Sequence, residues 1–154
     1  MLETARDRNV KRIAGLLVLF LLIAGTALLT AAPSTITWKP LDLAILTLDG
    51  KAPKTWNAYR AEKHDAWILV KLWRRYLFLD LREQVVYDID PQKLKPKGDA
   101  FEWSEADRPS TPVAISGWDA RSVGPMRRIR FKFGANGSIL EIQLPQKPDL
   151  RPFY

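Results

Sequence analysis

The feature that most constrains this chain is an uncharged apolar run near its N-terminus, IAGLLVLFLLIAGTALLTAA at residues 13–32. An α-helix of this length extends roughly 30 Å, which is about the hydrocarbon thickness of a bilayer. A cleavable signal peptide has a shorter apolar region, about 7 to 15 residues, followed by a small-x-small cleavage site. Thr30-Ala31-Ala32 could imitate such a site, but Pro33 would then follow the scissile bond. We therefore interpret residues 13–32 as an uncleaved transmembrane helix.

Basic residues are distributed unequally on the two sides of this span. The segment that follows it, 33–44, contains Lys39 as its one basic residue, whereas four precede it: Arg6, Arg8, Lys11 and Arg12. Lysine and arginine are retained on the cytoplasmic side of a membrane. We expect a single-pass protein of a bacterial inner membrane, with the N-terminus in the cytoplasm and the C-terminal domain in the periplasm.

The chain divides into five predicted parts. They are a cytoplasmic tail (1–12), the transmembrane helix (13–32), a juxtamembrane connector (33–40), an extracytoplasmic β domain (41–146) and a proline-rich tail (147–154). The chain has no cysteine, which excludes disulfides and thiolate sites. It has 24 basic and 17 acidic residues; removing the four and two in residues 1–32 leaves 20 and 15, a net charge of +5. This modest surplus suits lipid headgroups or an acidic protein, and no nucleic acid is expected.

Two hairpins are predicted from the alternation of apolar and polar residues. The first joins 76–81 to 85–90, and its expected apolar contacts are Leu77, Leu79 and Leu81 with Val85, Tyr87 and Ile89. The second is RRIRFKF–GANG–SILEIQL, with an Asn136-Gly137 turn. Its predicted buried face consists of Ile129, Phe131, Phe133, Leu140, Ile142 and Leu144.

The remaining segments give weaker patterns. Residues 66–73 and 112–116 are strand candidates, 41–48 is a strand or a short interfacial helix, 58–67 could hold a helical turn, and 91–111 and 117–126 are interpreted as loops. The expected fold class is mainly β: a small antiparallel sheet, sandwich or half-open barrel of about five to six strands with at most one short helix.

No catalytic site, metal site or cofactor is predicted. His64 is the one histidine, and the adjacent Asp65 would point to the opposite face of a strand, so we expect a surface histidine. The carboxylates Asp99, Glu102, Glu105 and Asp107 lack calcium-loop spacing and suit a solvated loop. Asp80, Asp88 and Asp90 could pair as general acid and base, but outward charges on a hairpin are the simpler interpretation.

A basic stripe is the clearest candidate contact surface. Arg128, Arg130 and Lys132 alternate with apolar residues and should line one outer face, which Arg127 would extend. Two interpretations remain open. The stripe is either a solvated face with cross-strand partners such as Glu141, or a docking face for an acidic protein or lipid headgroups.

Other candidate partner contacts are aromatic or small residues. Trp73 adjoins two arginines, and Trp38 lies where an interfacial anchor would sit; tryptophan and arginine are enriched at interaction hot spots. Within the span, small residues share one helical face and would let another helix approach closely. They are Ala24, Ala27 and Ala31, with Gly25 at the margin.

Together these features suggest a non-catalytic, single-span accessory subunit of a large membrane complex, which by analogy could be photosynthetic or respiratory. Other subunits would contact its transmembrane helix and its β domain. The alternative is a membrane-tethered ligand-binding module, or an envelope enzyme with an unrecognised site. That alternative requires a concave aromatic pocket that includes His64 or the 99–107 loop.

The charge asymmetry about the span makes a prediction about topology. A reporter that fluoresces only in the cytoplasm, fused after Tyr154, should stay dark because the C-terminal domain lies outside the cytoplasm. Whole-cell fluorescence, normalised to fusion protein on an immunoblot, measures this. A bright fusion would reverse the predicted orientation.

Overall fold

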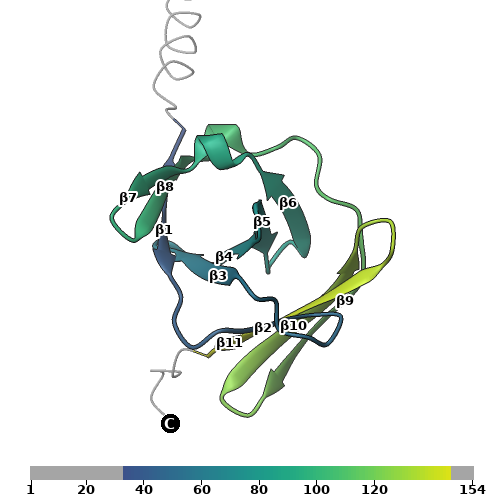
Figure 1. Ribbon diagram of the computed structural model, residues 1–154. Coiled ribbons are helices and arrows are strands. Elements are labelled where there is room, and N and C mark those ends of the chain that lie inside the picture. The colour runs from purple at the N-terminus through teal and green to yellow at the C-terminus, as the bar shows by residue number, and fades with distance from the viewer. Residues whose placement is uncertain (1–32, 147–154) are drawn as a thin grey trace, which may run out of the picture. The chain divides into compact units, whose positions relative to one another are not determined.

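The computed structural model describes residues 33–146, which form two antiparallel sheets (Figure 1). A seven-stranded sheet has the order β6-β5-β4-β3-β1-β8-β7. Its strands are β1 (Thr35–Pro40), β3 (Trp56–Ala61), β4 (His64–Leu72), β5 (Arg75–Asp80), β6 (Val85–Ile89), β7 (Lys95–Lys97) and β8 (Ala100–Ser104). A four-stranded sheet has the order β2-β11-β10-β9, with β2 (Ile45–Leu48), β9 (Ile115–Val123), β10 (Met126–Phe133) and β11 (Ser138–Pro145).

The prediction of a mainly β, antiparallel fold is confirmed, but the expected five to six strands were too few. The described residues contain eleven strands and two short 3₁₀ helices, η1 (Pro91–Lys93) and η2 (Glu105–Asp107). The predicted span 13–32 lies outside the described residues, as do the tails 1–12 and 147–154. Within residues 33–146, no helix is long and apolar enough to cross a membrane.

The seven-stranded sheet curls on itself and encloses an aromatic core (Figure 1). At its centre the ring of Phe78 lies 5.3 Å from that of Trp38 and 5.7 Å from that of Trp103, both with edge-to-face geometry. Such offset arrangements favour aromatic pairs beyond the area they bury. The buried residues of this inner core are Ile36, Trp38, Tyr59, Ala61, Leu69, Tyr76, Phe78, Ile89, Leu94 and Trp103.

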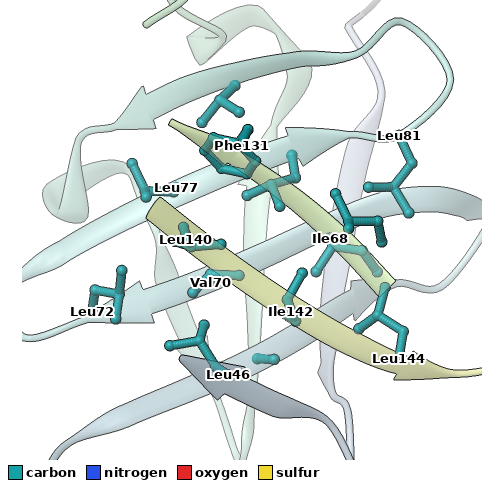
Figure 2. Close-up of a cluster of buried hydrophobic side chains, with 14 of the residues drawn as sticks. Leu46, Ile68, Val70, Leu72, Leu77, Leu81, Phe131, Leu140, Ile142 and Leu144 are labelled. Atoms are coloured by element: carbon teal, nitrogen blue, oxygen red, sulfur yellow. The ribbon is translucent and has the colours of Figure 1, made fainter. Parts of the chain in front are cut away.

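A second core lies between the two sheets (Figure 2). The alternate residues Ile68, Val70 and Leu72 of β4 point into it, whereas Leu69 points into the curl. The side chains of β5 alternate between the two cores in the same way, and Leu77 points into the second core. β4 and β5 are therefore buried on both faces, which explains why their sequences are almost continuously apolar.

The β10–β11 hairpin matches its prediction. Phe131 lies opposite Leu140 and Ile129 opposite Ile142, all on the face that meets the seven-stranded sheet. Of the four loop residues 134–137, Gly134 and Gly137 have positive φ, and the Gly137 N–H donates to the Gly134 carbonyl. The turn therefore depends on the two flanking glycines, because glycine enters the left-handed region without a Cβ clash.

The predicted facing of the β5–β6 hairpin was right for Leu77, Leu79 and Leu81, which all lie in the core between the sheets, but it was wrong for β6. Leu79 lies opposite Val86 between the sheets, whereas Tyr87 lies opposite Phe78 inside the curl. A hydrophobic pattern specifies strand register when one face is polar. Here both faces are apolar, so the pattern gave no means of choosing between them.

Three segments were assigned to the wrong structure. Residues 58–67 form most of β3 and the start of β4 rather than a helical turn, and β8 lies within the predicted loop 91–111. β9 covers most of 117–126. These strands carry many exposed or charged residues, since their stability comes from pairing with buried neighbours rather than from their own hydrophobicity.

Phe131 tests the core between the sheets. Replacing this fully buried phenylalanine with alanine should lower the free energy of unfolding by about 3 to 5 kcal/mol, because the cavity left behind collapses poorly. Chemical denaturation followed by tryptophan fluorescence measures the loss. The neighbouring Lys132→Gln, on the exposed face of the same strand, is the control and should change stability by under about 1 kcal/mol.

Candidate functional site

The outer face of the four-stranded sheet carries the predicted basic stripe. Because Ile129, Phe131 and Phe133 of β10 point into the core, the residues between them point outward. Arg128 is half-buried there, whereas Arg130 and Lys132 are exposed. The three residues lie on one face, as alternation predicts.

Arg127 does not belong to this outer face. It shares the alternation of Ile129 and lies opposite Leu144 on β11 and Ser122 on β9. Since successive side chains of a strand point to opposite faces, Arg127 is on the reverse side from Arg128. The expectation that it extends the stripe was therefore wrong.

Carboxylates neutralise part of the outer face. Arg128 Nε lies 3.4 Å from Glu141 Oε1, an ion-pair contact without hydrogen-bond geometry, and Arg121 Nε lies 3.0 Å from Asp119 Oδ1. Glu141 Oε2 also accepts a long hydrogen bond from the Thr47 hydroxyl. No carboxylate among residues 33–146 forms an ion pair with Arg130 or Lys132, so these two cations are available to an external partner.

The unpaired arginine lines a shallow depression on this face. The depression has a volume of about 450 Å³ and is lined by Thr47, Asp49, Gly50, Arg130, Ile139 and Glu141. Asp49 is committed to structure, because its Oδ1 accepts the Ile139 N–H at 2.8 Å. On the same face of β2, Ile45 is 52% exposed. Ile45 lies across β11 from Arg128, in register with Gln143. Exposed apolar area on the same face as arginine resembles the composition of protein interfaces, where arginine is enriched.

The two tryptophans expected to contact partners occupy different environments. Trp38 has no exposed surface and packs inside the curl, so this position does not fit an interfacial anchor. Trp73 is 57% exposed at the β4–β5 turn, where its φ of 53° is rare for a bulky residue. The neighbouring Arg75 is paired with Asp88 at 2.8 Å. Of the two tryptophans, only Trp73 is accessible.

The small residues proposed as a helix-packing face, Ala24, Gly25, Ala27 and Ala31, lie outside the described residues. His64 stacks on Trp67, with ring centroids 3.9 Å apart and planes 10° from parallel. It is half-buried, not freely exposed. Stacking explains its position without a catalytic role.

The three aspartates of the β5–β6 region have structural roles. Asp80 is buried, and its Oδ1 accepts the N–H groups of Arg82 and Glu83 at 3.1 Å each, which closes the turn. Asp88 pairs with Arg75, and Asp90 caps η1 by accepting the Gln92 N–H. The expectation of outward charges was therefore wrong for Asp80.

Two of the four carboxylates in the acidic stretch form ion pairs. Glu102 pairs with Lys97 at 2.8 Å, and Glu105 pairs with Arg108 at 3.3 Å. In the described part of the chain, no three histidine, aspartate or glutamate side chains are grouped so that they could hold a metal ion.

Arg108 has a role that the sequence did not suggest. Its guanidinium carbon lies 4.8 Å from the ring centroid of Trp67, 5.1 Å from Phe78 and 5.6 Å from Tyr87. Cation–π attraction of this kind strengthens as water is excluded. Arg108 therefore packs against the aromatic core. The three rings that it contacts come from β4, β5 and β6, which are distant from it in the sequence.

No protein-family model, no curated protein and no solved structure matches this chain. The functional proposals below therefore rest on its own residues.

The buried turn at Asp80 provides a stability test. Asp80→Ala should destabilise the domain by about 1 to 3 kcal/mol, because two backbone N–H groups lose their acceptor. Denaturant titration measures this. Asp88→Ala, which removes an exposed ion pair on the next strand, should cost under about 1 kcal/mol; equal losses would contradict the role assigned to Asp80.

Proposed function

We propose that this protein is a non-catalytic, single-span accessory subunit of a large membrane complex. Its β domain would dock on an acidic surface of a neighbouring subunit through the outer face of the four-stranded sheet. The observation that carries the proposal is the pair of exposed cations, Arg130 and Lys132, for which residues 33–146 supply no ion-pair partner.

The composition of the face supports a protein partner. Arg130 can form a bidentate contact with a carboxylate, and Ile45 supplies exposed apolar area on the same face of the sheet. The neighbouring Arg128 and Arg121 are already paired with carboxylates, which limits net repulsion between cations on the face. Complementary charges of this kind speed association and select the partner more than they raise affinity.

The membrane component of the proposal is supported by the sequence. The uncharged run 13–32 has the length of a transmembrane helix, and its small residues suit close approach of another helix. The protein would make two contacts, one in the bilayer and one at the β domain. Once the first contact has formed, the second becomes intramolecular, so its effective concentration rises. A photosynthetic or respiratory complex is a narrower proposal, which rests on analogy with assemblies that recruit such subunits.

The docking face can be tested in the assembled complex. The double variant R130Q/K132Q should assemble less well than the wild type, since it removes the two unpaired cations. Each exposed pair formed with a partner is worth up to about 1 kcal/mol, so we expect roughly a five- to thirtyfold loss of association. Native gels of mild-detergent extracts measure retention in the complex. Wild-type retention should also fall as salt rises.

A matched control removes the same charge elsewhere. Lys93→Gln with Lys95→Gln takes two exposed cations from η1 and β7 of the other sheet, and should leave retention unchanged. Thermal melting of each variant should differ little from the wild type. If R130Q/K132Q and the control behave alike at every salt concentration, the outer face is merely solvated. Binding of the domain to anionic vesicles but to no subunit would favour lipid headgroups instead.

A further inference from the structure

A second, larger depression lies on the seven-stranded sheet, away from the basic stripe. It has a volume of about 740 Å³ and is bounded by the β1–β2 connection, β3 and the β7–β8 turn. Its lining combines apolar and aromatic side chains with two carboxylates. The lining includes Leu41, Asp42, Leu43, Trp56, Tyr59, Asp99 and Phe101.

The two carboxylates have no compensating cation. Asp42 and Asp99 form no hydrogen bond or ion pair with any residue of 33–146, whereas the nearby Glu102 is paired with Lys97. The described segment carries a net charge of +4, since Lys147, Arg151 and Asp149 fall outside it. A depression lined by two unpaired carboxylates contrasts with that overall charge.

Two aromatic rings meet at the depression. The rings of Tyr59 and Phe101 pack edge to face with centroids 5.2 Å apart, whereas Trp56, three residues earlier on β3, packs against the core between the sheets. Tyr59 as a whole is only 8% exposed, but its hydroxyl oxygen is not fully buried and makes no hydrogen bond within the described part of the chain. The hydroxyl is therefore open to a ligand in the depression, which would replace water.

Burial, with smaller contributions from Tyr76 and Asp99, raises the pKa of the Tyr59 hydroxyl. The group therefore stays protonated at neutral pH and can donate to an oxygen or accept from a cationic N–H.

The rim is apolar and strained. Leu43 is 81% exposed and has a φ of 65°, a conformation rare for a leucine. Backbone strain of this type persists where surrounding structure holds it, and it is concentrated at ligand sites. Leu41, two residues earlier, also lines the depression.

We infer that this depression binds an organic cation, an ammonium or guanidinium group carried on an apolar stem. Asp42 and Asp99 would supply the opposing charge, the Tyr59 hydroxyl would accept a hydrogen bond from the cation, and the leucines would contact the stem. This inference does not depend on the docking proposal, which concerns the other sheet.

The cation has two possible sources. One is a lysine or arginine of a partner protein. The other is this chain itself, because Lys147 and Arg151 follow the last described residues. Gln143 of β11 pairs with Ile45 of β2, and β2 directly follows the β1–β2 connection that bounds the depression.

Titration with N-acetyl-arginine amide tests the site, with its neutral isostere N-acetyl-citrulline amide as the matched control ligand. Both are added to the full chain and to a chain that stops after Gln146, and binding is followed by isothermal titration calorimetry. We expect saturable binding of the arginine compound alone. D42N/D99N should weaken it about tenfold, since each exposed ion pair contributes up to about fivefold. Tyr59→Phe should weaken it further, whereas the distant Glu83→Gln should have no effect.

The comparison of the two chains assigns the source. Tighter binding to the shortened chain means that residues 147–154 compete for the site, and equal binding means that the cation comes from a partner. Failure of both chains to bind overturns the inference. So does equal binding of the citrulline compound, or unchanged binding by D42N/D99N with its melting temperature preserved.

Discussion

The structure depends on burying β4 and β5 on both faces at once. One face of these strands meets the four-stranded sheet, and the other lies inside the curl of their own sheet. A strand with two buried faces needs apolar residues at successive positions. Residues 68–70 (ILV) of β4 and 77–79 (LFL) of β5 supply them. Because packing is dense on both sides, a change of register would move every one of these side chains into the wrong core.

This arrangement determines where polar chemistry can occur. Apart from Asp80, the interior positions of β4 and β5 are filled by aliphatic and aromatic side chains, so most charged groups of the described residues lie on exposed faces and turns. Arg108 is an instructive case, since its guanidinium packs on three aromatic rings while its Nη2 pairs with Glu105. The two proposed sites follow the same logic. One is the open side of β10, and the other lies where the β1–β2 connection and the β7–β8 turn meet beside β3.

The two sites have opposite charge. The outer face of the four-stranded sheet offers the cations Arg130 and Lys132, whereas the depression near β3 offers the carboxylates Asp42 and Asp99. Within residues 33–146 none of the four forms an ion pair. Separate sites of opposite sign suit separate partners, because each repels what the other attracts. A subunit that bridges components of a larger assembly would benefit from such a division.

The sequence by itself determined the antiparallel, mainly β class, the β10–β11 hairpin with its apolar face, and the outward position of Arg128, Arg130 and Lys132. These follow from a period-two pattern with one polar face, which is local information. Only the tertiary structure decided that Trp38 is buried and that β8 is a strand. It also brought Asp42, Tyr59 and Asp99 together from three separate segments. Such placements depend on which strands pair over long sequence distances, and no local pattern encodes a pairing between distant strands.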